Sequence, residues 1–271
     1  MTSSIFFSYR SINLTLFLIF SINLFGQSPY EISYKKDVPL LAGAVIGNFL
    51  GARFINNNLS PFTVSEIGQL DRQNINRFDR IAIDNYSSSA RALSDVLLYS
   101  TFSYPALILL DKPIRKDYFK IGILAVESLG WTITVTTLTK GLTKRTRPFM
   151  YNPAIPFEDK IDSNGRLSFF SGHTAGVASI SFFTAKVLND YYPNSKWKSA
   201  IWSVASIIPV TTGYLRIRSG KHYPTDVLTG LIVGGAIGIL IPHFHKKKKK
   251  KASTNLSLLP SGNGLGIVLV W

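Results

Sequence analysis

Long apolar segments alternate with short polar connectors through most of the 271-residue chain. Each segment holds few charges, and Gly and Ser recur inside it, as they do in helices that pack closely within a bilayer. Buried helices of a soluble all-helical bundle have similar lengths and are the alternative interpretation. The pattern favours an all-α fold, a polytopic transmembrane bundle of about six helices. The predicted segments are Val38–Phe54, Ala92–Leu110, Tyr118–Thr139, Phe169–Leu188, Ala200–Leu215 and Val227–Phe244.

The N-terminal region carries a separate apolar run, Ile12–Phe25, which follows Arg10 and precedes small and polar residues. Its length suits the core of a signal peptide and is short for a membrane span. We therefore predict a signal peptide at residues 1–26, with an uncleaved membrane anchor as the alternative. The rest of the chain divides into N-terminal helices and a polar connector at 27–117, a core at 118–245, and a basic run and tail at 246–271.

The C-terminal tail differs in composition from everything before it. Leu265, Ile267 and Leu269 alternate with Gly or Val after a Ser-Gly-Asn-Gly turn at 261–264. This alternation predicts a small β-hairpin, to which the sequence assigns no function.

The chain is strongly basic, with 30 Lys and Arg against 15 Asp and Glu and a formal charge of +15. Such an excess suits anionic partners, namely phosphates, acidic lipid headgroups or nucleic acid. The connectors Asp111–Asp117 and Asn189–Ser199 are short and basic, and they lie on the same side as Lys246–Lys251 if the helices alternate. The positive-inside rule makes that side cytoplasmic. We interpret the lysine run as a topology anchor and expect no nucleic-acid partner.

The predicted topology contains one conflict. Cleavage of a signal peptide leaves the new N-terminus outside, whereas six alternating spans require Lys35 and Lys36 inside. Either the first apolar segment does not cross fully, or the signal peptide stays as an extra helix.

Polar clusters at the ends of the apolar segments supply candidate chemistry, and because the chain has no cysteine, none of them is thiol-based. The first cluster closes the third segment with Lys140, Arg147 and Pro148. Lys140 and Arg147 are seven residues apart, about two helical turns, so both can face one direction. Two fixed cations at this spacing predict a receptor for a phosphate or a similar oxyanion, with contact to lipid headgroups as the alternative.

The second and third clusters add proton-transfer groups. Ser171 and Gly172 open the fourth segment, where backbone N–H groups and the helix dipole favour an anion, and His173 follows in the first turn. The third cluster lies before the sixth segment and contains Arg216, His222 and Asp226. Five residues separate Arg216 from His222, and three separate His222 from Asp226. A carboxylate bonded to one imidazole nitrogen leaves the other nitrogen nucleophilic.

The combination and order of the three clusters, Lys-x6-Arg-Pro, Ser-Gly-His and Arg-x5-His-x3-Asp, resembles the type 2 phosphatidic acid phosphatase (PAP2) superfamily. That superfamily includes membrane lipid phosphatases, soluble bacterial class A acid phosphatases and vanadium haloperoxidases. The resemblance covers roughly residues 118–244. Phe170 stands where the family normally has Pro, and Leu215 where it usually has Ser. Neither position supplies a catalytic group.

The resemblance implies a role for each matching residue. His222 is the expected nucleophile and forms a phosphohistidine, Asp226 orients it, and His173 protonates the leaving oxygen and then activates water. No metal and no other cofactor is expected, because fixed cations stabilise the phosphoryl charge. The residues expected to hold the phosphoryl group are Lys140, Arg147, Ser171, Gly172 and Arg216.

These patterns predict a lipid phosphatase of the bacterial inner membrane with its active site facing the periplasm. The expected partners are the bilayer and a lipid carrying a phosphate or a diphosphate. A soluble periplasmic acid phosphatase keeps the same chemistry, and a haloperoxidase requires vanadate in the same pocket. A non-catalytic membrane protein that binds anionic lipid through its basic loops is a fourth possibility, but it leaves the ordered histidines unexplained.

Overall fold

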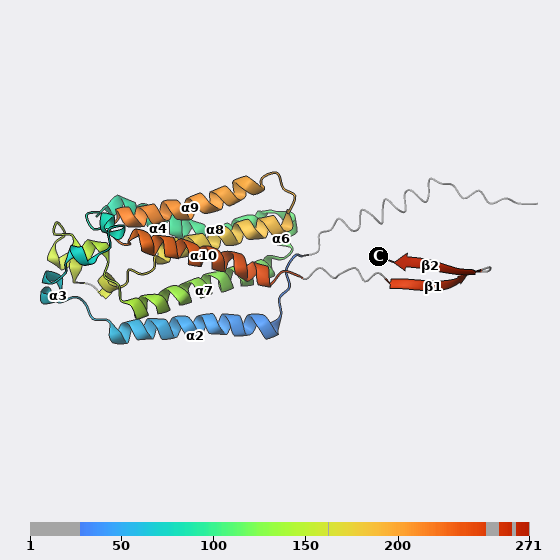
Figure 1. Ribbon diagram of the computed structural model, residues 1–271, viewed down its shortest axis with the longest axis horizontal. Coiled ribbons are helices and arrows are strands. Elements are labelled where there is room, and N and C mark those ends of the chain that lie inside the picture. The colour runs from blue at the N-terminus through green and yellow to red at the C-terminus, as the bar shows by residue number, and fades with distance from the viewer. Residues whose placement is uncertain (1–27, 162, 248–254, 262–263, 271) are drawn as a thin grey trace, which may run out of the picture.

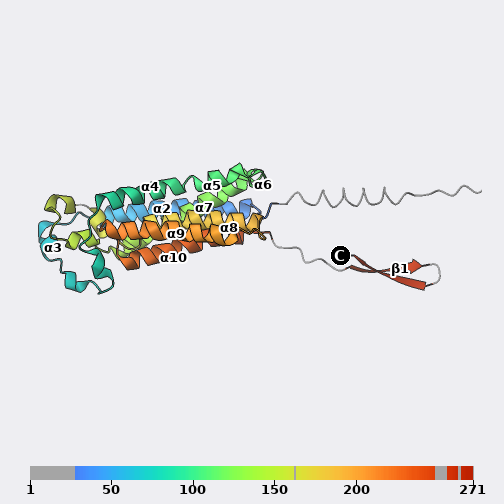
Figure 2. The same cartoon turned by 90° about the horizontal axis from the view of Figure 1, so that it is seen from above.

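The computed structural model describes residues 28–161, 163–247, 255–261 and 264–270. Within these residues, six long helices lie side by side in one elongated bundle (Figure 1, Figure 2). This arrangement confirms the all-α prediction of about six helices. The predicted signal peptide and the lysine run from residue 248 onward lie outside the described residues. The long helices are α2 (Tyr34–Asn58), α4 (Ser88–Thr101), α7 (Tyr118–Thr143), α8 (Gly172–Tyr191), α9 (Lys198–Arg218) and α10 (Pro224–Phe244).

Short elements connect the long helices, and most of them gather at the end of the bundle where α3 lies (Figure 1). The segment predicted as one helix over Ala92–Leu110 is interrupted after α4, since Pro105 begins a new turn and cannot donate a backbone hydrogen bond. The short helices are α3 (Val64–Gly68), α5 (Tyr104–Leu107) and α6 (Lys112–Arg115), and the 3-10 turns are Arg72–Asn74, Asp79–Ala82, Ile108–Leu110, Pro148–Tyr151, Phe157–Lys160 and Ser163–Arg166.

The tail contains the predicted hairpin. Strand β1 (Asn255–Ser261) pairs antiparallel with β2 (Gly264–Val270), with Leu258 opposite Ile267. The turn residues 262 and 263 lie outside the described part of the chain.

Five helices of the described residues are long and apolar enough to cross a membrane: Tyr34–Asn58, Ser88–Leu110, Tyr118–Tyr151, Lys198–Arg218 and Pro224–Phe244. Large apolar side chains on these helices stay exposed, for example Val45, Val96 and Ile232 at 70%, 62% and 69%. Such a surface matches hydrocarbon rather than water. Helix α8, which corresponds to the fourth predicted span, Phe169–Leu188, is not among these five helices. It lies at the centre of the bundle and buries Ser and Thr together with Ala and Val.

The first predicted span crosses the whole bundle. Helix α2 has 25 residues, which corresponds to about 37 Å, and it runs beside α7 along the bundle (Figure 1). Lys36 lies at the far end, where its ammonium donates to the carbonyl of Phe244 at the end of α10. Helix α2 is therefore long and apolar enough to cross a membrane.

Helices α8 and α10 approach each other so closely that glycine is required between them. A Cβ added at Gly230, Gly234 or Gly238 would lie 2.6, 2.1 and 2.1 Å from carbonyl oxygens of α8. The three glycines are four residues apart and share one face of α10, as in small-residue contacts between membrane helices. This contact brings the start of α8 next to the start of α10, where the second and third sequence clusters lie.

Candidate active site

The three sequence clusters meet at one end of the bundle, the end that carries α3 (Figure 1). The end of α7 and the segment after it contribute Lys140 and Arg147, and the start of α8 contributes the second cluster. The end of α9 and the turn into α10 contribute the third cluster. The structure therefore brings all eight predicted site residues to one place.

The three predicted cations converge. The Lys140 ammonium donates to the Leu167 carbonyl at 2.5 Å, and an Arg147 Nη2 lies 3.5 Å from the same oxygen. Arg216 is only 4% exposed, and its Nη1 donates to Ser94 Oγ at 3.1 Å. Its buried Nε has no hydrogen-bond partner among the described residues. A buried guanidinium group with a spare donor, as in Arg216, suits an oxyanion that supplies both charge and an acceptor.

His222 lies within this group of cations. Its side chain is buried, and this burial lowers the pKa of the imidazole well below the usual value. The positive charges of Lys140, Arg147 and Arg216 lower the pKa further. The ring is therefore neutral near pH 7, which leaves a nitrogen lone pair available for attack.

The predicted hydrogen bond between His222 and Asp226 does not form in this geometry. Nδ1 of His222 lies 3.5 Å from Oδ2 of Asp226, beyond good hydrogen-bond distance, and Nδ1 has no partner among the described residues. Oδ2 accepts instead from Ser168 Oγ at 2.5 Å and from the Tyr223 N–H at 2.9 Å. A rotation of the imidazole, with Asp226 held in place, is the movement that would close this contact.

Ser171 and Gly172 shape the start of α8. Ser171 is the N-cap, its Oγ accepts from the Thr174 N–H at 3.4 Å, and its own N–H donates to the Asp226 carbonyl. A Cβ on Gly172 would lie 3.2 Å from the Thr136 methyl and 3.8 Å from Cε of Lys140. The helix start thus packs directly against the lysine stem, so its dipole and the ammonium act on the same space.

Comparison with known proteins identifies the family of the chain. The PAP2 superfamily model matches residues 122–250. Phosphatidylglycerophosphatase B of Bacillus subtilis is 34% identical over 155 residues, which cover 56% of this chain and 71% of that protein. The chain belongs to the PAP2 superfamily. It is also a multi-pass membrane protein.

Other PAP2 relatives carry different substrate names. The lipid A 4'-phosphatase of Porphyromonas gingivalis is 27% identical over 49% of this chain and 52% of its own length, so the chain spans about half of that relative. The undecaprenyl-diphosphatase of Sulfolobus acidocaldarius is 32% identical over 50% of this chain and 58% of its own length. A solved transmembrane PAP2 type phosphatidylglycerolphosphate phosphatase from B. subtilis aligns with 78% of this chain and 96% of that one, at a TM-score of 0.47 and 22% identity.

Arg145 holds the carboxylate of the PAP2 site, a role that the sequence did not reveal. Its Nη1 donates to Asp226 Oδ1 at 2.6 Å and its Nη2 to Asp79 Oδ2 at 2.7 Å. Burial acts to raise the pKa of Asp79, but hydrogen bonds from Thr225, Arg145 and Asn76 outweigh it and lower the pKa below the usual value. Asp79 is therefore an anion, and it anchors both Arg145 and the first turn of α10.

Asp95 is a second residue that the sequence left without a role. Its Oδ1 lies 2.8 Å from Nε2 of His173 and 3.4 Å from Nη1 of Arg216. The only signal in the sequence was a carboxylate inside an apolar segment. Through these contacts Asp95 orients both the predicted general acid and one predicted phosphate ligand.

The turn that carries His222 depends on Gly220. Its φ of +68° lies in the left-handed region, and a Cβ there would lie 2.2 Å from the Asn85 carbonyl oxygen. The Gly220 carbonyl also accepts from the Phe149 N–H at 3.0 Å. The turn is thus fixed against the loop before α4 and the segment after Arg147.

Proposed function

We propose that this PAP2 member hydrolyses the phosphate or diphosphate of a membrane lipid through a phosphohistidine on His222. One observation carries the proposal: the buried imidazole of His222 lies among the cationic side chains of Lys140, Arg147 and Arg216. A phosphoryl group brings negative charge to these cations and presents its phosphorus to the imidazole.

The first step transfers the phosphoryl group to the protein. A ring nitrogen of His222 attacks phosphorus, and the bond from phosphorus to the lipid oxygen breaks. His173 donates a proton to that departing oxygen, so the lipid leaves as a neutral hydroxyl or, from a diphosphate, as the protonated monophosphate. The charge that develops on the phosphoryl oxygens is stabilised by Lys140, Arg147 and Arg216, assisted by Ser171 and the Gly172 N–H.

The second step releases phosphate. His173, now neutral, accepts a proton from water, and the oxygen of that water attacks phosphorus as the bond to His222 breaks. Free phosphate leaves, and both histidines return to their starting protonation states. We expect the imidazole of His222 to turn toward Asp226, 3.5 Å away in this structure, which then orients the ring through both steps. Arg145 and Ser168 hold Asp226 in place. No step needs a metal ion.

The position of the site on a membrane-spanning bundle favours a lipid substrate. The site lies at one end of an apolar bundle, so a phosphate at the bilayer surface reaches the cations while its tail stays in hydrocarbon. The names of three relatives state lipid A, phosphatidylglycerophosphate and undecaprenyl diphosphate. Under the positive-inside rule the short basic connectors are cytoplasmic, so we place the site at the periplasmic face of a bacterial inner membrane.

Phosphate release by detergent-purified protein in EDTA tests the proposal. The substrates are phosphatidic acid, an isoprenoid diphosphate and a soluble aryl phosphate, and the proteins are wild type, His222→Ala and His243→Ala. His243 is exposed at the opposite end of the bundle and serves as the matched control. We expect release from a lipid by wild type and His243→Ala but not by His222→Ala.

Two other results would point to other functions. Preference for the aryl phosphate over both lipids would favour the soluble-substrate alternative. Equal release by wild type and His222→Ala would exclude the phosphohistidine mechanism.

A further inference from the structure

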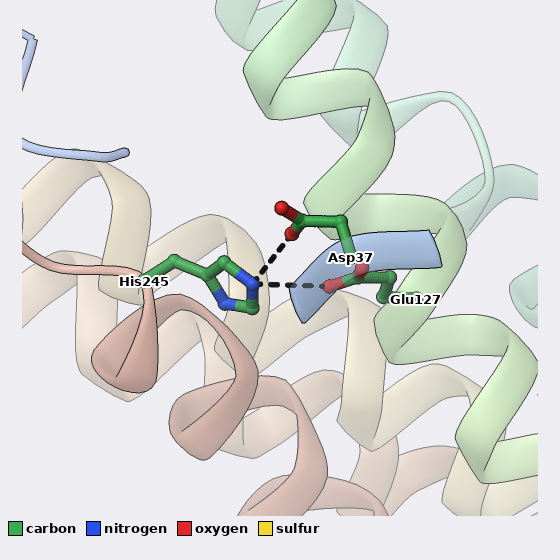
Figure 3. Close-up of side chains that lie close together, drawn as sticks. All are labelled: Asp37, Glu127 and His245. Atoms are coloured by element: carbon green, nitrogen blue, oxygen red, sulfur yellow. Dashed lines mark hydrogen bonds and ion pairs between the residues drawn. The ribbon is translucent and has the colours of Figure 1, made fainter. Parts of the chain in front are cut away.

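A second histidine cluster lies at the end of the bundle opposite the phosphatase site. Asp37 in the first turn of α2, Glu127 within α7 and His245 just after α10 point toward one another (Figure 3). Nε2 of His245 lies 2.7 Å from Oδ1 of Asp37 and 3.5 Å from Oε2 of Glu127. All three side chains are buried, and one potential ligand atom from each lies within 4.8 Å of the other two.

The hydrogen bonds determine which nitrogen of His245 is protonated. Nδ1 lies 2.7 Å from the Ile241 carbonyl oxygen, which only accepts, so Nδ1 carries the hydrogen. In the neutral ring, Nε2 then presents a lone pair to two carboxylates. Three electron-pair donors thus face one another in a buried space, an arrangement that needs protons or a metal cation between them.

A proton on Nε2 answers only part of this requirement. It bonds to Asp37 at 2.7 Å, but Glu127 is fully buried, lies 3.5 Å from Nε2 and faces the carboxyl group of Asp37. The nearby ammonium of Lys36 donates to the Phe244 carbonyl instead. Two carboxyl groups this close inside a membrane bundle are costly as anions, so the geometry of the cluster points to a cation that engages all three side chains.

We propose that Asp37, Glu127 and His245 form a binding site for a divalent transition-metal ion of the Zn²⁺ class. One imidazole nitrogen and two carboxylate oxygens are ligands that Zn²⁺ takes, whereas Ca²⁺ and Mg²⁺ prefer oxygen alone. A 2+ ion with two carboxylates and a neutral imidazole has no net charge, which suits a buried site. Water completes the coordination.

The outer contacts match those of metal sites. The Nδ1–H bond to Ile241 fixes the ring so that Nε2 faces the ion, as in most metal-binding histidines. The second oxygen of Asp37 accepts from the Ser33 N–H, which leaves Oδ1 for the ion. Ligand atoms around a tetrahedral Zn²⁺ lie about 3.3 Å apart, so the 2.7 Å contact must widen by roughly 0.6 Å on binding.

The site joins three parts of the chain that are far apart in sequence. Near it, the Glu31 N–H donates to the His245 carbonyl and the Lys247 N–H to the Pro29 carbonyl. A metal ion bound to α2, α7 and the end of α10 stabilises this end of the bundle. Its role is structural and does not involve the phosphatase reaction.

Metal analysis of full-length protein tests this inference. Protein without a polyhistidine tag is loaded with Zn²⁺ in detergent, desalted and assayed for bound zinc. We expect about one Zn²⁺ per wild-type chain and a higher melting temperature than in EDTA. Loss of an outer-shell contact lowers metal affinity roughly 10- to 100-fold. Because Glu127 is a proposed ligand, we expect Glu127→Gln to lower the Zn²⁺ affinity by more than this. His243→Ala, which removes an exposed histidine two residues from His245, is the matched control and keeps the ion.

Two measurements keep the test decisive if Glu127→Gln does not fold. Asp37→Asn removes a second ligand independently and is expected to lose the ion as well. X-ray absorption of zinc-loaded wild type needs no variant, and we expect one imidazole with oxygen ligands. Substoichiometric zinc in wild type, full retention by a folded Glu127→Gln protein, or a zinc shell without one imidazole would each overturn the proposal.

Discussion

The two ends of the bundle place histidines in opposite electrostatic surroundings. At the phosphatase end, His173 and His222 lie among Lys140, Arg147 and Arg216. At the other end, His245 faces two carboxylates, Asp37 and Glu127. The imidazole is the same group in both places, and the sign of the surrounding charge decides what it can bind. An excess of cations suits a phosphoryl group, and an excess of carboxylates suits a metal ion.

The comparison also explains how one protein keeps two kinds of site apart. An acidic cluster near His222 would attract metal and compete with the phosphate for the cations. The carboxylates Asp79, Asp226 and Asp95, which lie next to the candidate site residues, are instead paired with Arg145 or Arg216.

Removal of one buried cation is expected to have the largest effect at the phosphatase end. Arg216→Gln should lower kcat for phosphate release by about 10²- to 10³-fold, the usual cost of one donor to a developing oxyanion. Arg218→Gln, two residues along the same helix and exposed, is the matched control and should change kcat little. Similar losses in both variants would mean that total charge, not the converging site, drives the reaction.

Asp95 is expected to contribute less, because it acts through His173 and Arg216. Asp95→Asn should lower kcat by roughly 10-fold, below the 10²- to 10⁴-fold that a general acid contributes, with little change in KM. Asp95→Glu should restore part of the rate. Asp84→Asn removes an exposed carboxylate paired with Arg72 and is the control. An unchanged kcat in Asp95→Asn would show that the 2.8 Å contact has no role in proton transfer.

Both ends depend on the glycine contact between α8 and α10. Gly234→Ala places a Cβ 2.1 Å from the Ala175 carbonyl and should destabilise the protein by about 1–3 kcal/mol, the cost of overpacking. Gly122→Ala, where no atom lies within 4 Å of the added Cβ, should leave the melting temperature unchanged or raise it slightly. Equal melting temperatures for the two variants would contradict the close approach of these helices.

The pH dependence follows from the surroundings of His222. Burial and the neighbouring cations lower its pKa from the ordinary 6.5, so the neutral nucleophile persists as the pH falls through 6.5. The acid limb of kcat/KM should therefore lie below pH 6.5 and reflect protonation of the free enzyme. Below pH 6.5 the unfolded chain therefore binds more protons than the folded one, so the free energy of unfolding decreases as the pH is lowered. An acid limb at or above 6.5 would indicate that the cations do not act on His222.

The sequence predicted the parts of this protein that depend on local pattern. Apolar runs identified the helices, and the motifs predicted a site from Lys140, Arg147, Arg216 and His222, which the structure brings to one end of the bundle. The motifs place these four residues at helix ends and in short turns, and these ends and turns meet in the fold.

The contacts that the sequence did not predict join residues far apart in the chain. Asp95 meets His173 across 78 positions, Asp79 meets Thr225 across 146, and Asp37 meets His245 across 208. Periodicity carries no information about such pairs, because they depend on which helices are neighbours. Arg145 lay inside a recognised cluster, but the chain leaves the helix at Lys144, whose φ is +48°, so its direction could not be inferred from helical spacing.

Trapping of a phosphoenzyme tests the central claim, that the cationic end transfers a phosphoryl group to His222. The protein is mixed with a ³²P-labelled aryl phosphate in EDTA, and acid-labile label on the chain is measured. An aryl leaving group needs little protonation, so His173→Ala should form the phosphohistidine and, lacking the base for the second step, accumulate it. His222→Ala should carry no label. Label on His222→Ala equal to that on His173→Ala would contradict the account.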